Sequence, residues 1–184
     1  MYAIVSLLDE QHNNQMLELW QGLEAECGLA GVALTPLPHF SWHIAAEYDL
    51  KRLETALAVL AAGSQPFTVR TTGLGFFTGA SPVVFIPVVK DRTISRYHQQ
   101  VWDLVLPAAM GPSDHYAPEV WVPHITLAYG DVDAARLGCA MEKLAFQPFS
   151  WEIPVDHLAL VYQLSGQVGR LQSSFPFGST NDAA

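Results

Sequence analysis

The order of apolar and polar residues along the chain switches between strand-like and helix-like periods. Short alternating or continuous apolar stretches predict strands, and apolar residues spaced three and four apart predict helices. The strands expected in this way are 2–8, 40–48, 67–72, 82–89, 122–129, 151–164 (as one or two strands) and 171–177. The helices are 13–27, 50–62, 91–109 and 134–144. This alternation predicts a mixed α/β (α+β) fold in a single domain over residues 1–177, followed by a disordered tail over 178–184.

The chain contains an internal repeat. Residues 37–42 (LPHFSW) and 122–127 (VPHITL) both have the order apolar, Pro, His, apolar, hydroxyl, apolar. A short acidic turn and a helix follow each copy, and then the tripeptide Gln-Pro-Phe, at 65–67 and at 147–149. The repeat predicts a duplicated strand–helix–strand unit. A pseudo-twofold relation between the halves would place the two His-containing strands side by side, facing one cleft.

Each repeat carries a His-x-Ser/Thr motif, formed by His39 and Ser41 in the first copy and by His124 and Thr126 in the second. Residues i and i+2 of a strand point to the same face, so each imidazole shares a face with its hydroxyl. Histidine can give or take a proton near neutral pH, and a hydroxyl can donate to a phosphate oxygen. We therefore expect phosphodiester cleavage in which one histidine activates water and the other protonates the departing oxygen, without a metal.

One copy of the motif alone would be more typical of an ordinary histidine, and only the doubling favours catalysis. His43 would share a face with His39 and Ser41 on a regular strand, so Ser41-x-His43 is an alternative pair. The register set by the preceding proline favours His39 and leaves His43 as a substrate contact on the cleft wall. Weaker candidates, each also typical of a core residue, are Tyr129 and Tyr162 as phosphate donors and Trp42 and Phe76 as base-stacking residues.

Composition and net charge limit the kinds of ligand that the protein is expected to bind. Half of the residues are hydrophobic and 15% are charged, which is typical of a compact globular protein. Nine basic residues against eighteen acidic ones give a formal charge of −9, without the basic stripe expected of a protein that grips long nucleic acids. A bound phosphate is therefore expected to belong to a small molecule or a strand end. The seven histidines show no His-Glu-x-x-His-like spacing on a helix, so a zinc cluster stays a minor alternative.

Cys27 and Cys139 are too sparse for a disulfide framework and lack zinc-site spacing, so two reduced, buried thiols are expected. No apolar run approaches the ~20 residues that span a bilayer. The apolar stretch 2–8 has no basic segment before it, which argues against a secretory signal. We expect a monomeric, cytoplasmic protein that does not contact a membrane.

The two motifs, His39-Phe40-Ser41-Trp42 and His124-Ile125-Thr126-Leu127, resemble those of the 2H phosphoesterase superfamily. That family includes RNA 2′,3′-cyclic phosphodiesterases, which are also called 2′-5′ RNA ligases. The resemblance implies two lobes with antiparallel-rich sheets flanking a cleft and helices outside. It also implies hydrolysis of a 2′,3′- or similar cyclic phosphate without a cofactor. In those terms His39 is the proton donor, His124 the acceptor, and Ser41 and Thr126 bind phosphate.

The chain differs from the RNA-processing branch of the family that it resembles at one place. That branch often has an arginine shortly after the second motif, where this chain has Ala128, Tyr129 and Gly130. Together with the acidity, this difference favours a small nucleotide or a short RNA 3′-end bearing a cyclic phosphate. The alternatives are RNA 2′-5′ end ligation, a non-catalytic nucleotide- or RNA-binding module of the same fold, and a structural, partner-binding protein.

Overall fold

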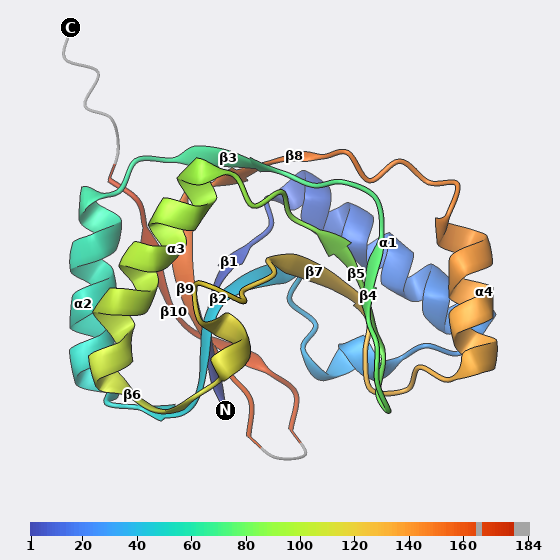
Figure 1. Ribbon diagram of the computed structural model, residues 1–184, viewed down its shortest axis with the longest axis horizontal. Helices are drawn as coiled ribbons and strands as arrows, with labels where there is room; N and C mark the ends of the chain where they lie inside the picture. Colours follow the sequence, from blue (N-terminus) through green and yellow to red (C-terminus); the bar gives the residue numbers. More distant parts are fainter. Residues whose placement is uncertain (165–166, 179–184) are drawn as a thin grey trace, which may run out of the picture.

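The structure is a computed structural model that describes residues 1–164 and 167–178. It has a mixed α/β fold, as the sequence predicts (Figure 1). Its strands are β1 (Tyr2–Leu7), β2 (His39–Tyr48), β3 (Phe67–Arg70), β4 (Gly75–Phe77), β5 (Val83–Pro87), β6 (Ala109–Pro112), β7 (His124–Ala128), β8 (Glu152–Val155), β9 (His157–Tyr162) and β10 (Arg170–Pro176). Its helices are α1 (Glu10–Cys27), α2 (Leu50–Gly63), α3 (Arg92–Val105) and α4 (Ala134–Leu144), with short 3-10 turns at η1 (Gly31–Leu34), η2 (Leu106–Ala108) and η3 (Asp114–Tyr116).

The strand order reflects the duplication. The main sheet runs β10-β9-β1-β2-β7-β5-β4, with β6 paired to β2, and every pair is antiparallel. On either side of the β2–β7 junction the order is equivalent, because β9-β1-β2 on one side corresponds to β4-β5-β7 on the other. Each repeat unit therefore starts one strand before its motif strand, as β1-α1-β2-α2-β3 in the first unit and β5-α3-β7-α4-β8 in the second. The last strands of the two units, β3 and β8, pair with each other in a separate two-stranded sheet. The two motif strands therefore meet at the centre of the fold.

All four helices begin at an aspartate whose carboxylate accepts backbone N–H groups of the first turn: Asp9, Asp49, Asp91 and Asp133. An N-cap aspartate satisfies donors that have no partner within the helix and opposes the positive end of the helix dipole. Asp9 and Asp91 occupy equivalent places in the two units, as do Asp49 and Asp133. Part of the negative charge that the sequence displays is thus used to start helices.

The first helix of each repeat unit packs on the motif strand of the other unit. Helix α2 lies beside α3 at one end of the molecule, and α1 lies beside α4 at the other (Figure 1). Helix α3 belongs to the second unit but contacts β2, while α1 belongs to the first unit but contacts β7. Most of the buried apolar residues form one continuous cluster that takes in all four helices and both motif strands. Each unit therefore supplies part of the support behind the other unit's motif strand.

The two cysteines are not free thiols, so the expectation of reduced cysteines was wrong. Cys27 at the end of α1 and Cys139 in α4 form a disulfide, with their Cα atoms 5.7 Å apart. The pairing depends on α1 and α4 lying side by side, and a sequence separation of 112 residues gives no sign of that neighbourhood. No helix within the described part of the chain is long and apolar enough to cross a membrane.

Most element boundaries agree with the expectations, and the differences have local causes. Helix α1 starts at Glu10 because Asp9 caps it, and the helix expected over 91–109 ends at Val105. Pro107, which cannot donate a backbone hydrogen bond, lies in the 3-10 turn that follows. The short strands β4 and β6 were not predicted. The tail expected at 178–184 lies outside the described residues except for Gly178, whose N–H donates to the Ala61 carbonyl at 3.0 Å.

Candidate active site

The two motif strands touch at one residue pair. Phe40 of β2 lies opposite Ile125 of β7, and both side chains are completely buried in the core. Side chains alternate along a strand, so the neighbours of this pair point to the other face of the sheet. The four motif side chains are those neighbours, and the structure therefore brings them together on one face.

Continuing the antiparallel register one step in each direction places His39 opposite Thr126 and His124 opposite Ser41. Each imidazole thus faces the hydroxyl of the other motif. Diagonal neighbours across such a pair have Cα atoms about 7–8 Å apart, which sets the scale of the distance between the two histidines. The positive charge of His124 acts on the pKa of His39, as expected for imidazoles that share a site.

Both motif histidines have the same anchored orientation. Nδ1 of His39 donates to the carbonyl of Leu37 at 2.5 Å, and Nδ1 of His124 donates to the carbonyl of Val122 at 2.8 Å. Because a carbonyl can only accept, the neutral ring carries its proton on Nδ1 and presents a lone pair on Nε2. Within residues 1–164 and 167–178, neither Nε2 has a hydrogen-bond partner. Each ring therefore presents the same nitrogen without a partner among the described residues.

Burial governs the ionisation of both rings. Burial lowers the pKa of His39, the bond to the Leu37 carbonyl opposes that effect, and the charge of His124 lowers it further. Burial also lowers the pKa of His124 against the opposing effect of the Val122 carbonyl. Two protonated imidazoles are thus disfavoured, while a bound phosphate anion would favour the first proton. Such a site can hold one proton on the pair, which then titrates as a unit.

A β-bulge follows the hydroxyl in each motif. Along β2, Ser41 pairs with Val5 and His43 pairs with Ile4, so Trp42 is an extra residue. Along β7, Thr126 pairs with Phe85 and Ala128 pairs with Val84, so Leu127 is the extra residue in the same place. Figure 1 shows both strands at the centre of the sheet. The duplication thus extends to an irregularity of the backbone.

The bulge overturns two of the sequence predictions. His43 no longer shares a face with Ser41: it is 0% exposed, and its Nδ1 is hydrogen-bonded to the Tyr48 hydroxyl. Burial lowers the pKa of His43 to about 4. Trp42 is also 0% exposed, and its ring stacks on Trp121 with centroids 5.5 Å apart. Neither side chain can contact a substrate, so both assignments as substrate-binding residues were wrong.

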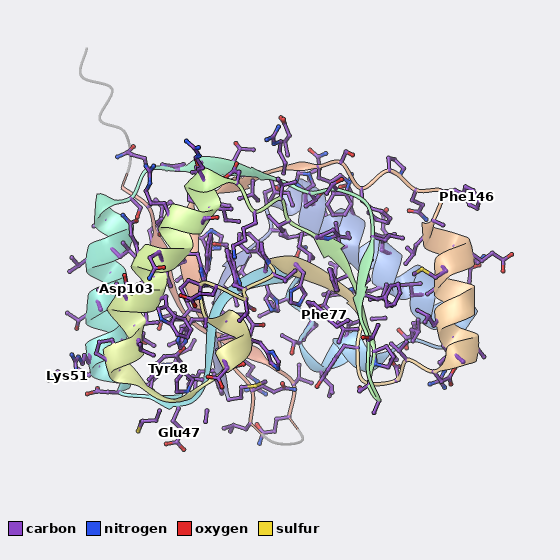
Figure 2. The ribbon with its side chains drawn as sticks, in the orientation of Figure 1. Glu47, Tyr48, Lys51, Phe77, Asp103 and Phe146 are labelled. Carbon is purple, nitrogen blue, oxygen red and sulfur yellow. A yellow bond between two sulfur atoms is a disulfide. The ribbon has the colours of Figure 1, made fainter. Side chains whose placement is uncertain are left out.

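Aromatic rings flank His124 on the site face. Phe77 of β4 is 37% exposed and stands edge-on to His124 with centroids 5.0 Å apart, and Phe85 lies at 5.0 Å from the same imidazole. Figure 2 shows Phe77 on the side of β4 that is nearer β7. Phe76, which the sequence suggested, points to the opposite face because successive strand residues alternate. Sequence reasoning missed Phe77 because strand β4 itself was not predicted.

The other candidates have different positions. Tyr129 follows β7 directly and is 50% exposed. Tyr162 of β9 pairs with Tyr2 of β1, and Tyr2 pairs with Ala45 of β2. Ala45 is six residues after His39 along β2, so Tyr162 lies away from the site.

Two further observations concern charged and metal-binding groups near the site. The ammonium group of Lys90 donates to the carbonyls of Pro118 and Trp121. The described residues hold no group of three or more side chains placed to bind a metal.

Solved structures share this fold over nearly the whole chain. The protein TT0787 of Thermus thermophilus superimposes with a TM-score of 0.69 at 21% identity, covering 98% of this chain and 99% of that one. Escherichia coli LigT in complex with 3′-AMP gives a TM-score of 0.61 at 15% identity, covering 97% and 98%. At these identities the likeness establishes the fold, which is that of LigT-like phosphoesterases.

The sequence identifies the family. The 2′-5′ RNA ligase superfamily matches residues 9–167, a span that includes both His-x-Ser/Thr motifs. The chain belongs to this superfamily, whose members are 2H phosphoesterases. A protein of Bacillus cereus (strain AH820), provisionally named a phosphoesterase, is 26% identical over 153 residues, which are 82% of this chain and 84% of that protein. The family resemblance and the mixed α/β fold expected from the sequence are thus confirmed.

Proposed function

We propose that this protein hydrolyses a cyclic phosphodiester, the 2′,3′-cyclic phosphate of a small nucleotide or of an RNA 3′-end. The observation that carries the proposal is the matched pair of imidazoles. Each is held through Nδ1 by the carbonyl two residues before it, and each faces the hydroxyl of the other motif. A binding module would have no need for two acid–base groups fixed in the same tautomer.

In the proposed reaction His124 is the base and His39 the acid. Nε2 of His124 takes a proton from water as the water oxygen bonds to phosphorus. The bond from phosphorus to one ribose oxygen breaks, and Nε2 of protonated His39 gives its proton to that oxygen. The ring opens to a phosphomonoester, and the proton gained by His124 restores the pair after it passes to His39 through solvent.

Ser41 and Thr126 are proposed to donate hydrogen bonds to the non-bridging phosphate oxygens. Their place supports the role, since each lies beside its own histidine and opposite the other one. Donors aimed at charge that grows in the transition state are worth more than donors to the substrate alone. Tyr129 stays a predicted additional donor. The chemistry balances without a cofactor or a metal.

A small ligand is favoured over a long nucleic acid. The chain carries a formal charge of −9, and Lys90 is occupied by two carbonyls. The LigT structures, which hold 3′-AMP and ATP, support a nucleotide-sized ligand for this fold. RNA end ligation is the second candidate, because a 5′-hydroxyl could replace water or leave in the reverse direction at the same two histidines.

The test is a substrate panel in the presence of EDTA. It contains the four 2′,3′-cyclic mononucleotides, ADP-ribose cyclic phosphate and an RNA with a cyclic-phosphate end, with and without an added 5′-hydroxyl RNA. We expect ring opening to a single phosphomonoester isomer, with mononucleotides at least as good as RNA. A joined RNA product as the main outcome would favour ligation. No turnover on any substrate, or turnover only after a metal is added, would contradict the proposal.

The cytoplasmic location and the monomeric state are parts of the proposal with their own tests. Disulfides are rare in the cytosol, so the Cys27–Cys139 bond is the feature that speaks against that location. Alkylation and mass spectrometry of protein from the cytosolic fraction would show whether these cysteines are reduced there, and light scattering gives the oligomeric state.

A further inference from the structure

The backbone carbonyl of each motif hydroxyl residue accepts a hydrogen bond from a tryptophan outside the motif. The indole N–H of Trp121 donates to the carbonyl of Ser41 at 3.1 Å. The indole N–H of Trp20 donates to the carbonyl of Thr126 at 3.0 Å. The two contacts are equivalent in the two halves, although Trp20 lies in helix α1 and Trp121 lies in the segment between η3 and β7. A feature that occurs twice at equivalent positions of the site calls for a common explanation.

The bulges give these bonds a mechanical role. The carbonyl of Ser41 belongs to the peptide plane that enters the bulge at Trp42, and the carbonyl of Thr126 enters the bulge at Leu127. A bulge interrupts the regular ladder and re-aims nearby side chains, so the orientation of this plane needs another restraint. Fixing the plane fixes the backbone rotation of the hydroxyl residue, and with it the direction in which the hydroxyl points.

Trp121 is itself held rigidly. Its ring stacks on His98 with centroids 3.7 Å apart and an interplanar angle of 5°. His98 donates through Nε2 to the carbonyl of Trp42, which is the bulged residue, at 3.0 Å. Lys90 donates to the carbonyl of Trp121 at 3.1 Å. The donor that reaches Ser41 is thus part of a buried assembly that contacts the bulge at two successive carbonyls.

The two tryptophans act across the duplication. Trp20 comes from the first unit and bonds the motif of the second, whereas Trp121 comes from the second unit and bonds the motif of the first. Each motif is therefore braced by the other half of the chain, in agreement with the crosswise packing of α1 on β7 and α3 on β2.

We propose that Trp121 and Trp20 are positioning residues, which aim the hydroxyls of Ser41 and Thr126 at the phosphate by holding the bulges that follow them. This inference rests on the proposed function for its kinetic readout. It assigns the tryptophans no contact with substrate. Loss of an indole N–H should then have the same kinetic signature as loss of the hydroxyl that it positions.

The test is a pair of double-mutant cycles. Trp121→Phe keeps an aromatic ring for stacking and removes the N–H donor, so we expect kcat to fall about tenfold with a smaller change in KM, as does Ser41→Ala. In the Ser41→Ala background, Trp121→Phe should change kcat by less than about twofold, because its effect acts through Ser41. When Trp121→Phe is combined with Thr126→Ala instead, the fold-losses in kcat of the two single variants should multiply. Trp20→Phe should behave in the same way toward Thr126→Ala and Ser41→Ala.

Trp102→Phe is the matched control, because Trp102 packs on His43 at 4.9 Å in the same region without a hydrogen bond to either motif. It should leave kcat within about twofold of the wild type, and circular dichroism should show that all variants are folded. Wild-type kcat in Trp121→Phe and Trp20→Phe would overturn the inference, as would losses that multiply with those of their own hydroxyls.

Measuring the Kd for 3′-AMP in the same double-mutant cycles separates this inference from the proposed function. If the wild type turns over no cyclic phosphate but binds 3′-AMP, the proposed function fails, and coupling of Trp121 to Ser41 in Kd would still support the positioning role. Absence of that coupling, or absence of 3′-AMP binding altogether, would overturn the inference as well.

Discussion

The two halves present the same groups to the site but surround them differently. On the site face, Leu7 pairs with His39 and Val5 pairs with Ser41. Both belong to a separate aliphatic cluster formed by Val5, Ala159 and Val161 with Ala3, Leu7 and Leu37 packed against it. The neighbours of His124 are the rings of Phe77 and Phe85. The duplication has therefore kept the pattern of imidazoles and hydroxyls and changed the residues that surround them. We infer that the aromatic wall beside His124 is where the two halves differ in what they offer a substrate.

A second difference lies behind the sheet. After Ser41 the buried positions are Trp42 and His43, which pack on His98 and Trp102 of α3. After Thr126 the equivalent positions are Leu127 and Ala128, which carry no polar side-chain atom. The core behind the first motif thus contains buried imidazoles, whereas the equivalent core behind the second motif is apolar. The bulge and its indole donor occur behind both motifs, although the packing around them differs.

The largest expected effect tests what the halves share. His39→Ala and His124→Ala should each lower kcat on a 2′,3′-cyclic nucleotide by about 10³-fold or more, because the proposed reaction needs both an acid and a base. The double variant should be little worse than either single one, since the two act as a unit. Stability should stay within ~1 kcal/mol by urea unfolding. Substantial activity in either single variant would remove the two-histidine mechanism.

The next effect concerns the aromatic wall. Phe77→Ala should raise KM for a nucleotide about fivefold through the loss of base stacking. It should also raise the pKa of His124, because burial lowers that pKa and the variant exposes the ring to more water. The acidic limb of the kcat/KM profile should therefore move to higher pH. Phe76→Ala, on the opposite face of β4, is the control. Equal behaviour of the two variants would show that the wall does not contact the substrate.

The buried imidazoles behind the first motif predict an effect on stability. Burial lowers the pKa of His43 and of His98 to about 4, against 6.5 for a free imidazole. Between those values the unfolded chain binds protons that the folded protein does not. The free energy of unfolding should therefore be highest above pH 6.5 and fall as the pH drops toward 4. His43→Leu should weaken this dependence in urea titrations and keep much of the activity; an unchanged slope would contradict the assignment.

The smallest expected effect is that of salt. A site that contacts one or two phosphates should give a log–log dependence of kcat/KM on salt concentration shallower than about −2. The slope should be similar for a cyclic mononucleotide and for a longer RNA with the same end. A marked preference for the RNA that disappears at moderate salt would reveal a basic channel and a larger partner.

The sequence was sufficient for the features that local periodicity records. The doubled motif placed His39, Ser41, His124 and Thr126 on one face, and most strands and helices agree with their patterns. The bulges could not be predicted, because no residue type in the sequence signals them. Each bulge adds one residue, which moves every later side chain of the strand to the other face. That single step explains why His43 was misassigned and why Trp42 was expected near the substrate.

The remaining misses depend on contacts between distant segments. Cys27 meets Cys139, and Trp20 meets Thr126, only because α1 crosses to the other half of the chain. Phe77 enters the site through a three-residue strand, which is too short to show an alternating pattern. The placement of the four motif side chains could thus be predicted from the sequence, while the residues that support and surround them required the tertiary structure.

The most direct test of the central claim is turnover of a 2′,3′-cyclic mononucleotide in ¹⁸O-labelled water with EDTA present, comparing the wild type with His39→Ala and His124→Ala. The account predicts rapid opening of the ring by the wild type alone, with one labelled oxygen in the phosphate of a single product isomer. Turnover that both variants retain, or that disappears from the wild type with EDTA and returns with a divalent metal, would contradict it.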